Sequence, residues 1–125
     1  MGIQNLASTA TKSVIPKLSG RFEEVVIVSL LRLGCTAVGC SARTVRMDIE
    51  SRLGEKVSIA VLYATLGRLE EKGFISSELI GPTGQQSVRS QRLFSVTEGG
   101  RNAMSKLRFF TERVWEGVDD KAVAA

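Results

Sequence analysis

Hydrophobic and polar residues recur with helical spacing over the first half of the chain, which predicts three successive helices. The predicted helices cover residues 21–33, 42–53 and 59–72. A glycine follows each of them, namely Gly34, Gly54 and Gly73, as is common at helix C-termini. Ser41 and Ser58 stand directly before the second and third helices, so we expect their side chains to act as N-caps.

After Gly73 the spacing changes from helical to alternating, which indicates strands. Residues 74–80 and 92–97 form two alternating runs, and the polar segment 81–91, which contains glycine and proline, separates them. A last amphipathic pattern follows Thr97, a candidate cap, and continues to residue 118. The second half of the chain therefore predicts a β-hairpin with a long tip and a closing helix.

This order of elements is the layout of a winged helix-turn-helix, so the predicted fold class is α+β and mainly α. It comprises three helices, a two-stranded hairpin as the wing, and a C-terminal dimerisation helix. We expect a flexible leader at residues 1–19, a winged-helix DNA-binding domain at 20–96, the dimerisation helix at 97–118 and a tail at 119–125.

Length and composition agree with one globular domain. The chain has 125 residues, of which 43% are hydrophobic and 24% charged. It contains no apolar run long enough to cross a membrane, and its N-terminus lacks the apolar core of a signal peptide. We expect a cytoplasmic, nucleoid-associated protein with no membrane partner.

The distribution of charge favours an anionic partner near the wing. The net charge is +4, which many soluble proteins share. No acid lies between Glu78 and Glu98, whereas Arg89 and Arg92 fall in that segment. We expect these two arginines to contact DNA phosphates, and the alternative is that they only keep a hairpin edge soluble.

The third helix has an outward face of small residues with few charges, as a helix that enters the major groove requires. The candidate DNA-contacting residues on this helix are Ser58, Ala60, Val61, Tyr63, Ala64, Thr65 and Arg68. Tyr63 is equally compatible with core packing and with a hydroxyl contact to phosphate. Arg43 and Thr44 on the second helix are further candidates for backbone contacts, although an exposed helix face also explains them.

Two motifs resemble the PadR family of bacterial transcriptional regulators. The family pattern Ser-x-x-x-Leu-Tyr-x-x-Leu-x-Arg-Leu-Glu-x-x-Gly is matched by Ser58, Leu62, Tyr63, Leu66, Arg68, Leu69, Glu70 and Gly73. The pattern at the end of the wing is matched by Leu93, Phe94, Val96, Thr97, Gly100 and Arg101. The resemblance implies a dimeric repressor that binds double-stranded operator DNA with the third helix and the wing. The wing departs from the Arg- and Lys-rich wings common in the family, so we expect weak phosphate contact from it.

The last helix carries apolar residues on more than one face, which favours burial against a second copy of the chain. The candidate interface residues are Met104, Leu107, Phe110, Val114 and Trp115. Some members of the PadR family bind flat ligands with an aromatic residue at the dimer interface. Trp115 is therefore a candidate contact for a small-molecule effector, although a plain interface anchor is the favoured interpretation.

The residues of enzymes and metal sites are missing from the sequence. The chain has no histidine, two cysteines and no phosphate-binding glycine loop, so we expect no enzyme activity, no cofactor and no metal. Cys35 and Cys40 are expected to be reduced thiols, and a disulfide across their turn is the less favoured alternative. The main alternative function is a winged-helix module for protein contact, or an assembly adaptor, without sequence-specific DNA binding.

Overall fold

The computed structural model describes residues 20–81 and 90–124. Its elements are α2 (Arg21–Arg32), β1 (Cys40–Ser41), α3 (Ala42–Leu53), α4 (Ile59–Glu71), β2 (Ile75–Ile80), β3 (Gln91–Val96), α5 (Glu98–Trp115) and α6 (Asp120–Ala124). The predicted fold class, a mainly helical winged helix, is confirmed. The sequence did not predict β1 or α6, because elements of two and five residues are too short to show a periodic pattern.

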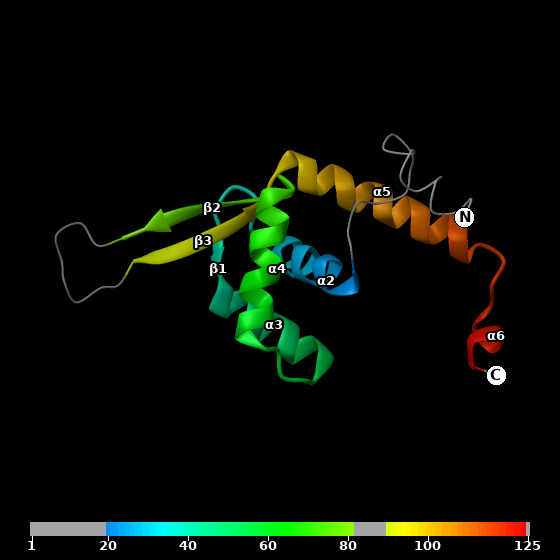
Figure 1. Ribbon diagram of the computed structural model, residues 1–125. Coiled ribbons are helices and arrows are strands. Elements are labelled where there is room, and N and C mark those ends of the chain that lie inside the picture. The colour runs from blue at the N-terminus through cyan, green and yellow to red at the C-terminus, as the bar shows by residue number, and fades with distance from the viewer. Residues whose placement is uncertain (1–19, 82–89, 125) are drawn as a thin grey trace, which may run out of the picture. The chain divides into compact units, whose positions relative to one another are not determined.

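The described residues fall into two compact units, residues 20–101 and 102–124. Helix α5 begins in the first unit and continues into the second. In the first unit, α2, α3 and α4 gather together, and β2 and β3 run side by side away from them (Figure 1). None of the helices in the described part of the chain is both long and apolar enough to span a membrane.

The sheet has three antiparallel strands in the order β1-β3-β2. Ile75 pairs with Val96 at the inner end of the hairpin, and Ile80 pairs with Gln91 toward its tip. β1 adds to the other side of β3, where Cys40 pairs with Phe94. This pairing ties the segment before α3 to the base of the wing.

The helices begin where their polar caps predict. The side-chain oxygens of Ser41, Ser58 and Thr97 accept hydrogen bonds from the backbone N–H three residues later, at 3.2, 3.3 and 3.0 Å. Each cap satisfies a backbone donor that the first turn of a helix leaves without an intrahelical partner. At the other end of α3, Gly54 adopts a left-handed conformation with φ 70°, which glycine adopts without steric cost.

The core of the first unit lies between the three helices and the inner ends of the strands. Its fully covered side chains include Val26, Ile27, Leu30, Val45, Ile49, Leu62, Leu66, Leu69, Ile75, Phe94 and Val96. On α2, Phe22 and Leu33 are only partly covered while Glu23 is buried. Ile59 is 40% exposed in the first turn of α4.

The expectation of two free thiols was wrong, because Cys35 and Cys40 form a disulfide. The turn after α2 brings their Cα atoms to 5.9 Å, which lies within the usual range for a disulfide. The backbone carbonyl of Cys35 also accepts a hydrogen bond from the N–H of Val96. The end of α2 is therefore joined to both β1 and β3.

Candidate nucleic-acid interface

Up to residue 69, the exposed face of α4 carries no carboxylate, and the exposed Glu70 and Glu71 follow at its C-terminal end. Ser58, Ala60, Val61, Tyr63 and Ala64 are all exposed, with Val61 at 51% and Tyr63 at 55%. No acidic residue occurs in residues 56–69. The exposure of Tyr63 leaves its hydroxyl available for a phosphate and removes the core-packing interpretation. A surface of methyl groups and hydroxyls without negative charge can approach a polyanion closely.

The structure corrects the prediction for Thr65. Its side chain is 0% exposed, and its hydroxyl donates a hydrogen bond of 2.8 Å to the carbonyl of Val61. Because this bond satisfies the hydroxyl inside the helix, threonine can occupy a core position at little cost. Thr65 therefore cannot reach a base edge, and Ala64 becomes the central residue of the exposed face.

Arg68, which the sequence assigned to the DNA backbone, also makes contacts within the protein. The guanidinium of Arg68 pairs with Glu23 of α2, with 3.3 Å between Nε and Oε2, and donates to the Thr65 hydroxyl at 3.1 Å. Lys72 reaches the other oxygen of Glu23 at 2.9 Å. Although half of the Arg68 side chain stays exposed, these bonds direct it toward α2. The residue then has a positioning role for α4.

Glu23 is the residue of this region that sequence analysis missed. Its side chain is 2% exposed, and a buried carboxylate is tolerated only where cations and hydrogen bonds compensate it. Its burial could have been inferred from its spacing to the core residues of α2. Glu23 stands three, four and seven residues before Val26, Ile27 and Leu30, the core positions of α2. An acid in an apolar stripe points to a paired charge.

Helix α3 supports α4 through the turn between them. Arg43 and Thr44 are exposed on α3, as expected for backbone contacts. Glu50 accepts a hydrogen bond of 2.7 Å from the backbone N–H of Val57 and pairs with Arg46 at 3.2 Å. The bond from Val57 lowers the pKa of Glu50 below its usual value, and Arg46 adds to that effect. This contact fixes the chain directly before the Ser58 cap.

The wing contributes one described arginine. Arg92 donates a hydrogen bond of 2.9 Å to the hydroxyl of Ser77, which in turn donates to Glu70 at 2.7 Å. These bonds link β3 through β2 to the end of α4, so Arg92 is held on the hairpin while it remains exposed. Arg89 lies outside the described residues.

An ion pair between α2 and α3 makes stability depend on pH. Asp48 accepts hydrogen bonds from Arg32 at 2.6 Å and from Ser29 at 2.7 Å. The bond from Arg32 is the main reason that the pKa of Asp48 lies below its usual value of 3.8. A lowered carboxyl pKa means that the unfolded chain binds the proton more tightly. The stabilisation is therefore complete above the usual pKa and is lost as the pH falls through the folded value.

We expect Asp48→Asn to lower the stability at neutral pH by about 1–2 kcal/mol and to leave it nearly unchanged at about pH 2. The measurement is the midpoint of thermal unfolding, followed by circular dichroism between these two pH values. Glu71→Gln, an exposed change at the end of α4, serves as the control and should follow the wild-type curve. A constant difference between Asp48→Asn and wild type at every pH would contradict the assignment.

The second unit exposes an apolar surface on α5. Phe109, Val114 and Trp115 are 50%, 58% and 52% exposed. Leu107 and Phe110 are half-buried. Met104, predicted to lie at a dimer interface, is only 5% exposed because the single chain already covers it, so that prediction was wrong. The remaining exposed residues gather toward the C-terminal half of the helix.

The arrangement offers no protein-bound metal. In residues 20–81 and 90–124, no three side chains of His, Cys, Asp or Glu come together in a way that could hold an ion. With the exception of Thr65, the candidate contact residues that lie in the described part of the chain are exposed, on α4 and its N-cap, on α3 and on the wing.

Solved winged-helix proteins share this fold at low sequence identity. The chain is similar to F93 from STIV, a winged-helix DNA-binding protein, with a TM-score of 0.60 and 18% identity over 80% of this chain and 98% of that one. A PadR-like transcription factor from Bacteroides fragilis has a TM-score of 0.60 and 16% identity, over 78% and 91%. A PadR family regulator from Eggerthella lenta has a TM-score of 0.57 and 14% identity, over 94% and 93%. Neither the protein-family models nor the curated proteins give a match.

Proposed function

We propose that this protein is a sequence-specific DNA-binding transcriptional regulator, a PadR-like repressor that acts as a homodimer. The observation that carries the proposal is the exposed face of the N-terminal part of α4, residues 59–69, which carries no carboxylate, within a winged-helix fold. Proteins of the same fold include a DNA-binding protein and transcription factors. The motifs of α4 and of the end of the wing agree with this function.

In the proposed complex, α4 enters the major groove of operator DNA. The methyl groups of Ala60, Val61 and Ala64 contact base edges and thymine methyls, which provides sequence preference. Ser58, at the N-terminus of the helix, and the Tyr63 hydroxyl contact phosphates. Further backbone contacts come from Arg43 and Thr44 on α3 and from Arg92 and Arg89 on the wing. Arg68 holds α4 against α2 and, with the exposed half of its side chain, remains a candidate for contact with the flanking backbone.

The homodimer forms through α5. The exposed side chains of Phe109, Val114 and Trp115 supply an apolar surface that a second copy can bury, and Leu107 and Phe110 extend it. A two-fold dimer places two α4 helices on a palindromic operator. The ring of Trp115 is also the candidate contact for a flat effector at this interface.

The test of the proposed function is a DNA titration at low and at physiological salt. The probes are the region upstream of the protein's own gene and a scrambled duplex of the same length. The proposal expects selective binding that persists at physiological salt and a footprint of two half-sites about one helical turn apart. Equal binding to both probes that disappears as the salt concentration rises would reflect net charge alone and would reject it.

A second candidate function is protein contact through the same helix. Ile59 and Tyr63, one turn apart on α4, are exposed apolar side chains that a protein partner could cover, and Val61 is exposed on another side of the helix. This adaptor function predicts no difference between the operator and the scrambled duplex. It also predicts that a carboxylate in the middle of α4 changes partner binding and leaves weak DNA binding unaltered.

The dimer has its own test. We expect Trp115→Glu to weaken dimerisation by about 2 kcal/mol or more, since buried tryptophans dominate interface energies and a buried charge is costly. Sedimentation equilibrium of the full chain measures the change. Val38→Glu places the same charge at a residue that is 74% exposed in the turn after α2, and it should leave the dimer intact. A wild-type chain that sediments as a monomer would refute the dimer, and equal effects of the two variants would refute the role of Trp115.

A further inference from the structure

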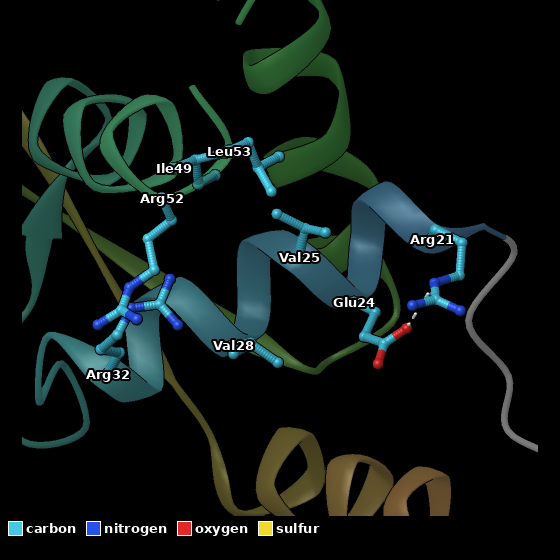
Figure 2. A pocket seen from close by; sticks show the side chains of 8 residues that line it. All are labelled: Arg21, Glu24, Val25, Val28, Arg32, Ile49, Arg52 and Leu53. Carbon is cyan, nitrogen blue, oxygen red and sulfur yellow. Dashed lines mark ion pairs between the residues drawn. The ribbon is translucent and has the colours of Figure 1, made fainter. Parts of the chain in front are cut away.

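A small cavity lies between α2 and α3 and is partly open to solvent, since Leu53 in its wall is 57% exposed. Its volume is about 200 Å³. Val25 and Val28 of α2 and Ile49 and Leu53 of α3 form its walls, and Figure 2 shows these side chains between two groups of charged residues. All four are branched aliphatic residues, so the middle of the cavity offers no hydrogen-bond partner.

The charged groups at its two ends are not equivalent. At one end, Arg21 pairs with Glu24 at 3.1 Å, so the two charges compensate each other. At the other end, Arg32 and Arg52 both line the cavity and both act on the Asp48 carboxylate (Figure 2). Arg32 is compensated by Asp48 at 2.6 Å. Arg52 has no ion pair within residues 20–81 and 90–124. Arg52 also acts electrostatically on Asp48, so two guanidiniums share one carboxylate and one net positive charge remains at the border of the apolar cavity.

We propose that this cavity binds a short aliphatic monocarboxylate. The carboxylate would pair with Arg52, since the planar guanidinium matches a carboxylate through two parallel hydrogen bonds. The hydrocarbon chain would lie between Val25, Val28 and Leu53, where it is removed from water. Because the site offers one net positive charge, it favours a ligand with a single negative charge. The small volume, below the roughly 300 Å³ of typical drug-sized pockets, favours a short chain.

The position of the cavity gives the ligand a route to the DNA-binding helix. Arg52 and Leu53 are the last residues of α3, directly before the turn at Gly54 that leads to α4. Glu50, one helical turn earlier, holds the N–H of Val57. A ligand bound to Arg52 and Leu53 would shift the C-terminal end of α3 toward the cavity. This shift would change the position of the turn and, through it, the affinity of α4 for DNA. Only this effect on DNA rests on the proposed function; ligand binding itself does not.

The test is an NMR titration of the full, isotope-labelled chain at constant ionic strength, without DNA. The probes are hexanoate, hexanol and acetate. Hexanol has a hydrocarbon chain of similar length but no charge, and acetate has the carboxylate but almost no hydrocarbon chain. We expect saturable shifts of the amide signals of Val25, Val28, Arg52 and Leu53 with hexanoate, and affinities at least about tenfold lower for hexanol and acetate. Absence of saturable shifts, or shifts confined to α5, would overturn the proposal.

Variants separate this cavity from other modes of binding. Arg52→Gln should lower the affinity for hexanoate at least about tenfold, and Arg52→Lys should lower it less. Val28→Phe should abolish hexanoate binding, because the larger side chain fills the cavity without changing any charge. Arg43→Gln removes an equal charge from the exposed part of α3 and should leave the affinity for hexanoate unchanged. Unchanged affinity in both Arg52→Gln and Val28→Phe would refute the site. Shifts of the same signals with protein concentration, and none with hexanoate, would show that a second copy of the chain occupies the cavity.

Discussion

Replacement of Ala64 by glutamate is expected to lower the affinity for operator DNA by about a hundredfold or more without unfolding the protein. Ala64 is exposed in the middle of the α4 face, so the longer side chain meets solvent in the free protein. In the complex its carboxylate would lie among phosphates and base acceptors, and like charges brought together cost several kcal/mol. The measurement is a fluorescence titration of a labelled operator with wild type and variant.

The control for this experiment carries the same charge elsewhere. Thr36→Glu adds a carboxylate in the exposed turn after α2, outside α4. Its affinity should fall only slightly, in line with the change in net charge. Thr65→Glu is unsuitable because that side chain is fully buried and the variant would destabilise the fold. Equal affinities of Ala64→Glu and Thr36→Glu would show that α4 does not face the DNA and would favour the adaptor function.

Gly100→Ala is expected to destabilise the protein by about 3 kcal/mol, at the upper end of the usual cost of overpacking. Gly100 lies in the first turn of α5, and a Cβ atom there would overlap with the backbone carbonyl of Phe74 and come within 2.8 Å of Val96. The same carbonyl accepts the N–H of Thr97 at 3.1 Å, so it cannot withdraw without breaking that bond. Urea unfolding followed by circular dichroism measures the loss.

The neighbouring glycine provides a matched control. A Cβ atom on Gly99 would lie 3.3 Å from the carbonyl of Gly73, a tight contact that a small shift can relieve. Alanine is also favoured over glycine in a helix by about 1 kcal/mol. Gly99→Ala should therefore be close to neutral or stabilising. If both variants lose the same stability, the close approach at Gly100 is not what requires glycine there.

Most helices and strands of the first unit could be predicted from local sequence signals. Ser41, Ser58 and Thr97 cap helices because a short polar side chain can reach a backbone N–H three residues ahead whatever the rest of the chain does. The change from helical to alternating spacing after Gly73 identified the hairpin for a similar reason. These signals depend on neighbours within one turn or one strand, so the sequence contains all of them.

Which side of each helix is buried could be determined only from the tertiary structure. Ala64 and Thr65 are adjacent and both small, and successive residues of a helix differ by about 100° in direction. Sequence alone cannot say which of the two lies at the border of the buried stripe. The packing of α4 on α2 decided it, by covering Thr65 and leaving Ala64 exposed. The same packing directed Arg68 to Glu23.

Contacts between distant segments were beyond the sequence altogether. Glu23 meets Arg68 and Lys72 across 45 and 49 residues. The cavity beside Arg52 is lined by residues of both α2 and α3, so it exists only where the fold brings these two helices together. The sequence by itself determined the helices, the hairpin and the candidate recognition helix, because these depend on local spacing and capping. Only the tertiary structure decided which side chains remain free to bind, because that depends on which surfaces the chain buries against itself.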